Sequence, residues 1–382
     1  MAARPDWYDA TYPDWRDGPP WVMEDMIAAQ VSLPEALTSV AGEAEQLLEA
    51  LRKAADQGQP IVTTACGTSE HASQALALIL SDALGVVVEA RQSLEQTLNP
   101  RSGGVCLAVS HGGLSKATVS ALRSARQQGA FAALITAAPV APSHEHADLI
   151  LSTPLRDASM CHTVGYTSPI LVGLMLADIH RGEQFPVRAL TSHLERLIGL
   201  QAHASVVAAT LGDVGIIVSA GSGIDRPAAR EFALKVAEGA RVATSVIELE
   251  NVLHGHLVAL DDTSGLLVVV TNQHGDRERA ERAREVVAGA RRIGLHCILA
   301  VSEELADVAG VDADDGQALL IPTSPELNPL ASSLLGSALA LQTLTVGLVH
   351  ERETNPDLLR REETPYREAV SVGNTKFPRP VV

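Results

Sequence analysis

Short apolar runs alternate with longer amphipathic segments along the chain, and the same order appears in both halves. In the first half the runs cover residues 60–65, 86–90, 105–110, 132–136 and 149–153. In the second half they cover residues 215–220, 244–247, 265–271, 296–301 and 318–321. Such runs are typical of strands buried on both faces of a parallel sheet, with helices between them. The pattern predicts an α/β fold with two five-stranded parallel sheets, each doubly wound in the flavodoxin-like manner with helices on both faces.

The repeat also divides the chain. Its 382 residues exceed what one hydrophobic core usually organises. We expect a first domain over residues 31–200 and a second domain over residues 201–350. An N-terminal arm with an entry helix would occupy residues 1–30, and a tail would occupy residues 351–382.

Composition limits the kinds of binding partner and the cellular compartment that we expect. A formal net charge of −17 argues against nucleic acid and anionic membranes. The longest apolar stretch, residues 331–349, is interrupted by Ser, Gln and Thr, which favours a buried helix over a membrane span. Four cysteines without CxxC spacing indicate reduced thiols, and no signal-peptide pattern opens the sequence. We therefore expect a cytoplasmic protein with no nucleic-acid or membrane partner.

Two turns rich in glycine and hydroxyl groups follow predicted strands of the first half. Gly67-Thr68-Ser69 follows residues 60–65, and a turn from Ser110 through His111 and Gly112 to Ser115 follows residues 105–110. Backbone N–H groups at helix starts and nearby hydroxyls bind anions, although either turn alone is equally compatible with ordinary turn and N-cap chemistry. Neither is a Walker A loop or a dinucleotide motif. Together they predict an anion site, to which Thr163 would add a hydroxyl.

Three motifs carry a resemblance to a known family. Cys66-Gly67-Thr68-Ser69 matches its first sugar-phosphate turn, residues 233–238 (ALKVAE) resemble the helix that ends in its catalytic glutamate, and residues 248–255 (ELENVLHG) resemble the segment with its ring-opening histidine. The chain is similar over about residues 20–350 to tandem SIS (sugar isomerase) domains. These include the isomerase half of glucosamine-6-phosphate synthase and related phosphosugar isomerases, deaminases and deglycases.

The resemblance implies a role for each matched residue. Glu238 would be the base that moves a proton between two carbons, and Lys235 would be a neighbouring cation. His254 would open the sugar ring, and in the family this histidine reaches the site from the partner subunit of a homodimer. A carboxylate and a histidine suit these proton transfers, and the reaction needs no metal or organic cofactor.

The chain departs from the family pattern at two places. Gly112 replaces a serine of the usual phosphate turn and His111 is introduced, so the head group is either a phosphate held differently or another anion such as a sulfonate. A protonated His111 would offset the missing hydroxyl. In the tail, residues 355–362 correspond to the stretch where the synthase has a lysine but contain arginines instead, and an arginine cannot form the imine that amino transfer requires. We expect Arg361 to contact the anionic substrate instead.

We therefore expect an aldose–ketose isomerase that acts on an anionic sugar, a hexose 6-phosphate or a 6-sulfonated hexose, through a cis-enediol(ate). Two alternatives stay open. An amino-sugar-phosphate deaminase or fructosamine-phosphate deglycase would use the same base and ring opener. A sugar-sensing SIS module would bind without turnover.

Overall fold

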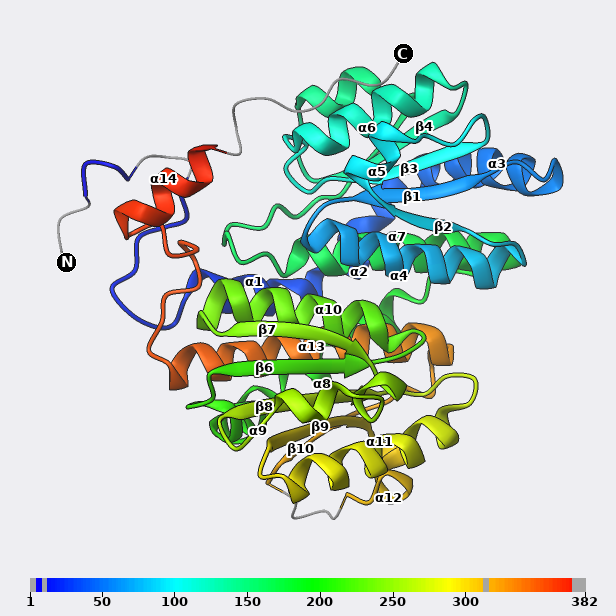
Figure 1. Ribbon diagram of the computed structural model, residues 1–382. Coiled ribbons are helices and arrows are strands. Elements are labelled where there is room, and N and C mark those ends of the chain that lie inside the picture. The colour runs from blue at the N-terminus through cyan, green and yellow to red at the C-terminus, as the bar shows by residue number, and fades with distance from the viewer. Residues whose placement is uncertain (1–4, 9–11, 312–315, 373–382) are drawn as a thin grey trace. The chain divides into compact units, whose positions relative to one another are not determined.

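The computed structural model describes residues 5–8, 12–311 and 316–372 of the chain (Figure 1). Its residues cluster into two compact units that are not continuous in sequence. The first-sheet unit comprises residues 32–157, 164–188 and the described residues from Glu362 onward. The second-sheet unit comprises the described residues up to Val31, residues 158–163 and the described part of 189–361.

The first-sheet unit contains a five-stranded, all-parallel sheet in the order β2-β1-β3-β4-β5. The strands β1 and β3 are completely buried, β3 with a continuously apolar sequence and β1 with two threonines among its apolar residues. The helices α3, α4 and α7 pack on one face of this sheet, and α5 and α6 pack on the other. The strands are β1 (Ile61–Ala65), β2 (Glu89–Gln92), β3 (Val105–Val109), β4 (Phe131–Thr136) and β5 (Leu149–Ser152). The helices of the unit are α2 (Leu33–Ala36), α3 (Ala41–Asp56), α4 (Thr68–Leu84), α5 (Ser93–Leu98), α6 (Lys116–Gln127), α7 (Val164–Arg181) and α14 (Thr364–Val372).

The second-sheet unit repeats this plan. Its sheet is again parallel, in the equivalent order β7-β6-β8-β9-β10 when read from the same edge. The helices α9, α10 and α13 lie on one face, and α11 and α12 lie on the other. The strands are β6 (Ile216–Gly221), β7 (Ala243–Glu248), β8 (Ser264–Val270), β9 (His296–Ser302) and β10 (Ala318–Ile321). The helices are α1 (Val22–Ala29), α9 (Gln201–Ala208), α10 (Asp225–Lys235), α11 (Asp276–Arg292), α12 (Ala306–Ala309) and α13 (Pro329–Glu351), and α8 (Val187–Ile198) leads into the unit.

The predicted fold class is therefore confirmed, with one error in detail. The apolar run at residues 86–90 was expected to be a strand, but β2 begins only at Glu89. Helix α4 ends at Gly85 in the left-handed conformation (φ 66°), and Val87 that follows is 88% exposed. The valines of this run lie in a loop before an edge strand, where hydropathy alone is a poor guide to strand position.

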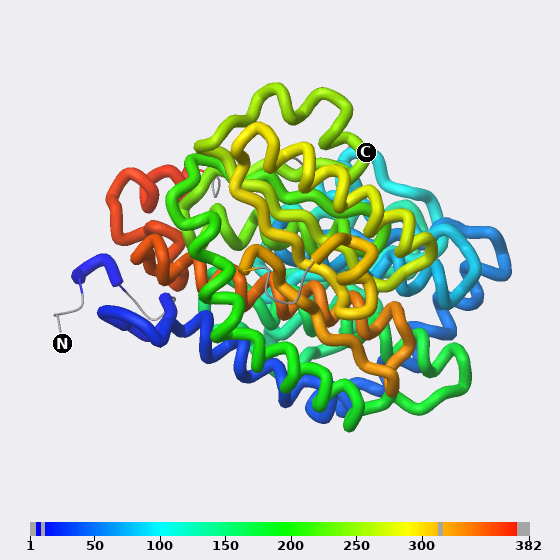
Figure 2. The backbone as a smooth tube through the Cα atoms, turned by 90° about the horizontal axis from the view of Figure 1, so that it is seen from below, coloured from blue at the N-terminus to red at the C-terminus, as the bar shows by residue number. Residues whose placement is uncertain are grey.

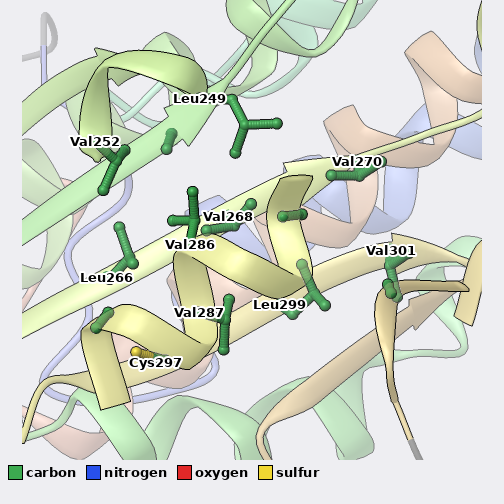
Figure 3. Packing of buried hydrophobic residues seen from close by; sticks show 14 of the residues in the cluster. Leu249, Val252, Leu266, Val268, Val270, Val286, Val287, Cys297, Leu299 and Val301 are labelled. Carbon is green, nitrogen blue, oxygen red and sulfur yellow. The ribbon is translucent and has the colours of Figure 1, made fainter. Parts of the chain in front are cut away.

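Side chains of α11 and the strands beneath it form the core on one face of the second sheet (Figure 3). Val286 and Val287 of α11 pack over Leu266, Val268 and the neighbouring residues of β8 and β9. Burying one such side chain stabilises the fold by about 1.5–3 kcal/mol relative to leaving it in water. This core fixes the strand ends from which the turns of the second-sheet unit leave.

The N-terminal helix is tied to the end of the same unit. Met23 and Ile27 of α1 share a buried cluster with Cys161 and with Val346 of α13, and the blue N-terminal segment can be followed into the unit in Figure 2. Asp357 accepts hydrogen bonds from the N–H groups of Val22 (2.8 Å) and Met23 (2.9 Å). Helix α13 is long and apolar enough to cross a membrane, but its apolar window is completely buried inside the protein. It is a core helix, as its interrupted sequence predicts.

Candidate functional site

The first glycine turn connects β1 to α4. Gly67 is the N-cap of α4 with φ +59°, a conformation that a residue with a side chain rarely adopts. Thr68 and Ser69 open the helix and are 7% and 9% exposed, so both hydroxyls belong to a packed turn rather than to a free loop. The predicted strand–turn–helix context of these residues is present.

The second turn connects β3, the direct neighbour of β1, to α6. The Ser110 N–H donates to the Ile135 carbonyl (3.0 Å), and the Gly113 N–H donates to the Ser110 carbonyl (3.1 Å). Ser115 is the N-cap of α6 and accepts from the Thr118 N–H at 3.5 Å. A Cβ atom at Gly112 would have nothing within 4 Å, so the hydroxyl missing at this position leaves open space.

His111 is not the cation that the sequence suggested. It is 8% exposed, and its Nε2 accepts a hydrogen bond of 2.7 Å from the Asp157 N–H, so this nitrogen carries no proton. Burial, aided by the positive charge of Arg156, lowers the pKa of His111 to about 4. The expectation of a protonated His111 is wrong, because the ring holds the segment that ends at Asp157 instead. Arg156, which is exposed, is the cation beside this turn, and no sequence motif drew attention to it.

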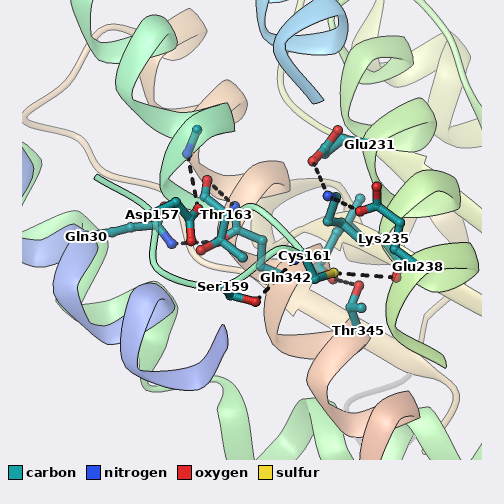
Figure 4. Close-up of polar contacts among 12 residues, drawn as sticks. Gln30, Asp157, Ser159, Cys161, Thr163, Glu231, Lys235, Glu238, Gln342 and Thr345 are labelled. Atoms are coloured by element: carbon teal, nitrogen blue, oxygen red, sulfur yellow. Dashed lines mark hydrogen bonds and ion pairs between the residues drawn. The ribbon is translucent and has the colours of Figure 1, made fainter. Parts of the chain in front are cut away.

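Lys235 and Glu238 form an ion pair in the second-sheet unit (Figure 4). Lys235 is the last residue of α10 and is 2% exposed, and its Nζ also lies 3.7 Å from Oε1 of Glu231. The chain continues into a π-helical turn, Val236–Ala240, that carries Glu238. Single π turns inside helices are rare and are frequent at functional sites. The Glu238 side chain is 23% exposed, so it is the member of the cluster that solvent reaches.

The charge of Lys235 is retained despite its burial. Desolvation alone would lower the pKa of this ammonium, but the negative charges of Glu238 and Glu231 outweigh it and raise the pKa above its ordinary value. Glu231 was not predicted, although a glutamate four residues before a lysine on a helix is a recognisable pair. The cluster therefore places a fixed positive charge against the Glu238 carboxylate.

Residues 158–163 lie around the Lys235 cluster (Figure 4). This segment contains Thr163 and contacts Arg361, the two predicted anion ligands of the second-sheet unit. The Cys161 thiol contacts the Lys235 carbonyl at 3.9 Å. The Thr163 carbonyl accepts from Nε2 of Gln342 on α13 at 3.3 Å, and Nη1 of Arg361 contacts the Met160 sulfur at 3.2 Å. Thr163 is completely buried and Arg361 is half-buried. One short segment thus connects both predicted anion ligands with the Lys235 cluster.

Tail residues also contact the turn that carries Glu238. Oγ1 of Thr354 donates to the Gly239 carbonyl at 2.7 Å. A Cβ at Gly239 would lie 3.1 Å from the Val349 side chain, a tight contact, and 3.4 Å from Pro356. The π turn is therefore enclosed by α13 and the tail, and a larger side chain at Gly239 would require these neighbours to shift.

His254 lies in a different environment. Its side chain is 66% exposed, and its Nε2 lies 2.9 Å from Oε1 of Glu250, whose other oxygen accepts from Nε of Arg282 at 2.9 Å. Among the described residues, His254 pairs with Glu250 and not with Glu238 or Lys235. The second-sheet unit does not bring the two predicted catalytic groups into contact with each other.

Comparisons with known proteins agree with this geometry. A model of the SIS domain family matches residues 55–179. Glutamine–fructose-6-phosphate aminotransferase (isomerizing) from Zymomonas mobilis is 23% identical over 313 residues, which make up 78% of this chain and 50% of that protein. The chain thus spans about half the length of the curated relatives it matches.

Solved structures share the fold across both units. The C-terminal domain of glucosamine-fructose-6-phosphate aminotransferase from Francisella tularensis aligns with a TM-score of 0.72 at 19% identity, covering 90% of this chain and 99% of that one. Tagatose-6-phosphate ketose/aldose isomerase from Escherichia coli aligns with a TM-score of 0.71 at 19% identity, covering 89% and 95%. The fold is a tandem α/β arrangement similar to that of these two solved structures. Residues 55–179, which hold the first sheet, match the SIS domain, and the second sheet repeats the strand order of the first.

Proposed function

We propose that this protein is an aldose–ketose isomerase acting on an anionic sugar, either a hexose 6-phosphate or a 6-sulfonated hexose. The observation that carries the proposal is the Lys235–Glu238 pair on its π turn, a partly exposed carboxylate held by a buried ammonium. The fold shared with a tagatose-6-phosphate isomerase supports the same reaction class. The open-chain sugar would pass through a cis-enediol(ate).

Each candidate has a defined task in this reaction. Glu238 removes the proton from one carbon and returns it to the neighbouring carbon, and Lys235 fixes the orientation of that carboxylate. His254 opens the ring, and its high exposure fits delivery to the site of a second subunit in a homodimer. The domain at residues 31–200 binds the anionic group, and the domain at residues 201–350 supplies the base.

The head group meets neutral donors in the first-sheet turns. Thr68, Ser69, Ser110 and Ser115 offer hydroxyls, and His111 contributes no charge. Arg156 and Arg361 are the cations that we assign to the head group or its surroundings. A site with few fixed charges suits a monoanionic sulfonate as well as a phosphate.

The same enolisation would release an amine if the substrate carried one, so deamination or deglycation is the alternative within this proposal. The compartment is the cytoplasm, in keeping with cysteines that form no disulfide.

Proton exchange in D2O tests the proposal. The protein is incubated with hexose 6-phosphates, 6-sulfonated hexoses and amino-acid adducts, and deuterium at C2 is followed by NMR. Glu238→Gln is expected to abolish incorporation, whereas Glu49→Gln, an exposed glutamate of α3, leaves it unchanged. Incorporation together with amine release identifies the deaminase or deglycase. Tight binding of one sugar without exchange contradicts the isomerase and supports a sugar sensor.

A further inference from the structure

A cavity lies at the carboxyl ends of the strands of the second sheet. It has a volume of about 780 Å³, within the range typical of small-molecule sites. It is lined by Ser222, Glu248, Leu249, Glu250, His274, Gly275, Glu278, Arg279 and Arg282. These residues follow β6, β7 and β8. Because the two sheets have equivalent strand orders, this is the position that the proposed anion turns occupy on the first sheet.

The turns around this cavity are cross-linked by buried polar groups. Asp225 is 1% exposed and accepts from the Thr271 N–H (3.1 Å), the Thr271 hydroxyl and Nε2 of Gln273 (2.7 Å). Oε1 of Gln273 accepts from the Ile224 N–H at 3.1 Å. The turn after β6 is therefore held to the turn after β8 before any ligand arrives.

Arg279 extends from α11 over the turn after β6. One Nη donates to the Ser222 hydroxyl, and Nε is buried without a hydrogen-bond partner among the described residues. A Cβ at Gly223 would lie 3.3 Å from the other Nη and 2.2 Å from Oε1 of Gln273, so the glycine makes room for both side chains. Within the described part of the chain, no carboxylate lies within 4 Å of Arg279, although its positive charge acts on the buried Asp225 carboxylate and opposes the rise of the Asp225 pKa.

The other charged groups of the cavity have partners or face solvent. Glu248 pairs with Arg226 at 2.7 Å, and Arg282 pairs with Glu250 at 2.9 Å and with Glu285 at 2.6 Å. Glu278 and His274 are exposed. Among the described residues, the lining thus offers one guanidinium that has no direct ion pair, beside several oxygen acceptors.

We infer that this cavity is a second binding site, for a phosphorylated sugar. The phosphate would bind the Arg279 guanidinium and the Ser222 hydroxyl, because an arginine recognises phosphate through several parallel hydrogen bonds. The sugar hydroxyls would donate to the carboxylates of Glu248 and Glu278. This inference concerns a site separate from Glu238 and holds whether or not the protein is an isomerase.

Binding here would be sensed by His254. The Glu250 side chain lines the cavity, and its carboxylate contacts both Arg282 and His254. A phosphate bound by Arg279 and Ser222 also attracts the Arg282 guanidinium of the same lining, which weakens the Arg282–Glu250 pair and changes the contact that Glu250 makes with His254. The site is thereby positioned to regulate the proposed ring-opening residue.

Titration of the whole protein with glucose 6-phosphate, followed by calorimetry and by NMR of His254, tests the inference. Arg279→Gln is expected to weaken one binding event at least tenfold and to remove the response of the His254 signal. Arg277→Gln, a side chain of the same helix that is 70% exposed and outside the cavity, is the matched control and leaves both unchanged. Inorganic phosphate is expected to bind the same site more weakly, because it lacks hydroxyl donors.

A second variant guards against misfolding. Ser222→Asp supplies Arg279 with a carboxylate and is expected to abolish the same event, with the melting temperature checked in parallel. Ser69→Ala in the first-sheet turn leaves this event intact. The inference is overturned if Arg279→Gln and Ser222→Asp titrate like the unmodified protein, or if Ser69→Ala removes all binding. Deuterium exchange at C2 is measured separately, so failure of this site and failure of the isomerase proposal give different results.

Discussion

The two units share one strand order but bury different polar groups beside their candidate sites. The first-sheet unit buries His111 as a neutral ring that accepts a backbone hydrogen bond. The second-sheet unit buries a charged lysine beside two glutamates, and it buries Asp225 beneath the cavity at its strand ends. The same scaffold thus carries neutral hydroxyl turns in one copy and a charge cluster in the other.

The difference teaches where the stability of each unit is vulnerable. A neutral buried ring destabilises the folded state only when it is protonated. A buried ion pair destabilises it whenever either partner is removed. Exposed pairs in the same unit, such as His254 with Glu250, contribute little to stability. The predictions below test this ranking, beginning with the largest expected change.

Lys235→Met is expected to have the greatest effect. It leaves Glu231 and Glu238 without their shared cation, and breaking a buried pair costs about 3–5 kcal/mol of unfolding free energy. Urea unfolding measures the loss. Lys53→Met, at an exposed position of α3, should change stability by less than about 0.5 kcal/mol. A loss below about 1 kcal/mol for Lys235→Met would mean that the cluster is better solvated than its burial indicates.

Asp225 should make the second-sheet unit less stable as pH rises. Burial raises the pKa of Asp225 to about 7, from 3.8 in the unfolded chain, despite the opposing hydrogen bonds from Thr271. Between these values the folded state binds more protons, so roughly 4 kcal/mol is lost as pH rises from about 4 to 7. Unfolding curves of Asp225→Asn at several pH values should lack this loss. Equal pH slopes in the variant and the unmodified protein would contradict it.

His111 should act in the opposite direction in the first-sheet unit. Its folded pKa of about 4 lies below the unfolded value of 6.5, so the unfolded chain binds the proton more readily. Stability is full above pH 6.5 and falls by about 3 kcal/mol as pH drops to 4. The measurement compares unfolding free energies at pH 7 and pH 4 in the unmodified protein and in His111→Gln, which can still accept from the Asp157 N–H. A variant that is equally acid-sensitive would refute the assignment.

His254→Gln should change stability least, by less than about 0.5 kcal/mol, because both members of its pair are more than half exposed. On the proposed function, turnover of ring-closed sugar falls about 100-fold. Thermal unfolding and an NMR isomerisation assay measure the two effects in one preparation. A stability loss above 1 kcal/mol with unchanged turnover would show that His254 has a structural role instead.

Much of this arrangement can be predicted from the sequence. Buried strands such as β1 and β3 leave a largely apolar signal, and the glycine turns after them mark the edge of a parallel sheet where ligands usually bind. The start of edge strand β2 was misplaced because the apolar run before it lies in a loop, where Val87 is exposed. The state of His111 depends on a contact with Asp157, 46 residues away in sequence, which no local pattern encodes. The pairing of Glu231 with Lys235 could have been predicted from their i, i+4 spacing, but the burial of Glu231 could not.

The π turn at Val236–Ala240 has a consequence for how this segment can evolve. An α-helix advances by about 100° per residue, so one extra residue in a turn rotates everything that follows by about a quarter of a circle relative to an uninterrupted helix. Removing a single residue here would leave the buried face of α10 in phase but would swing the carboxylate of Glu238 away from Lys235. On the proposed function, a one-codon deletion between Lys235 and Glu238 would abolish turnover while the surrounding fold and sugar binding persist.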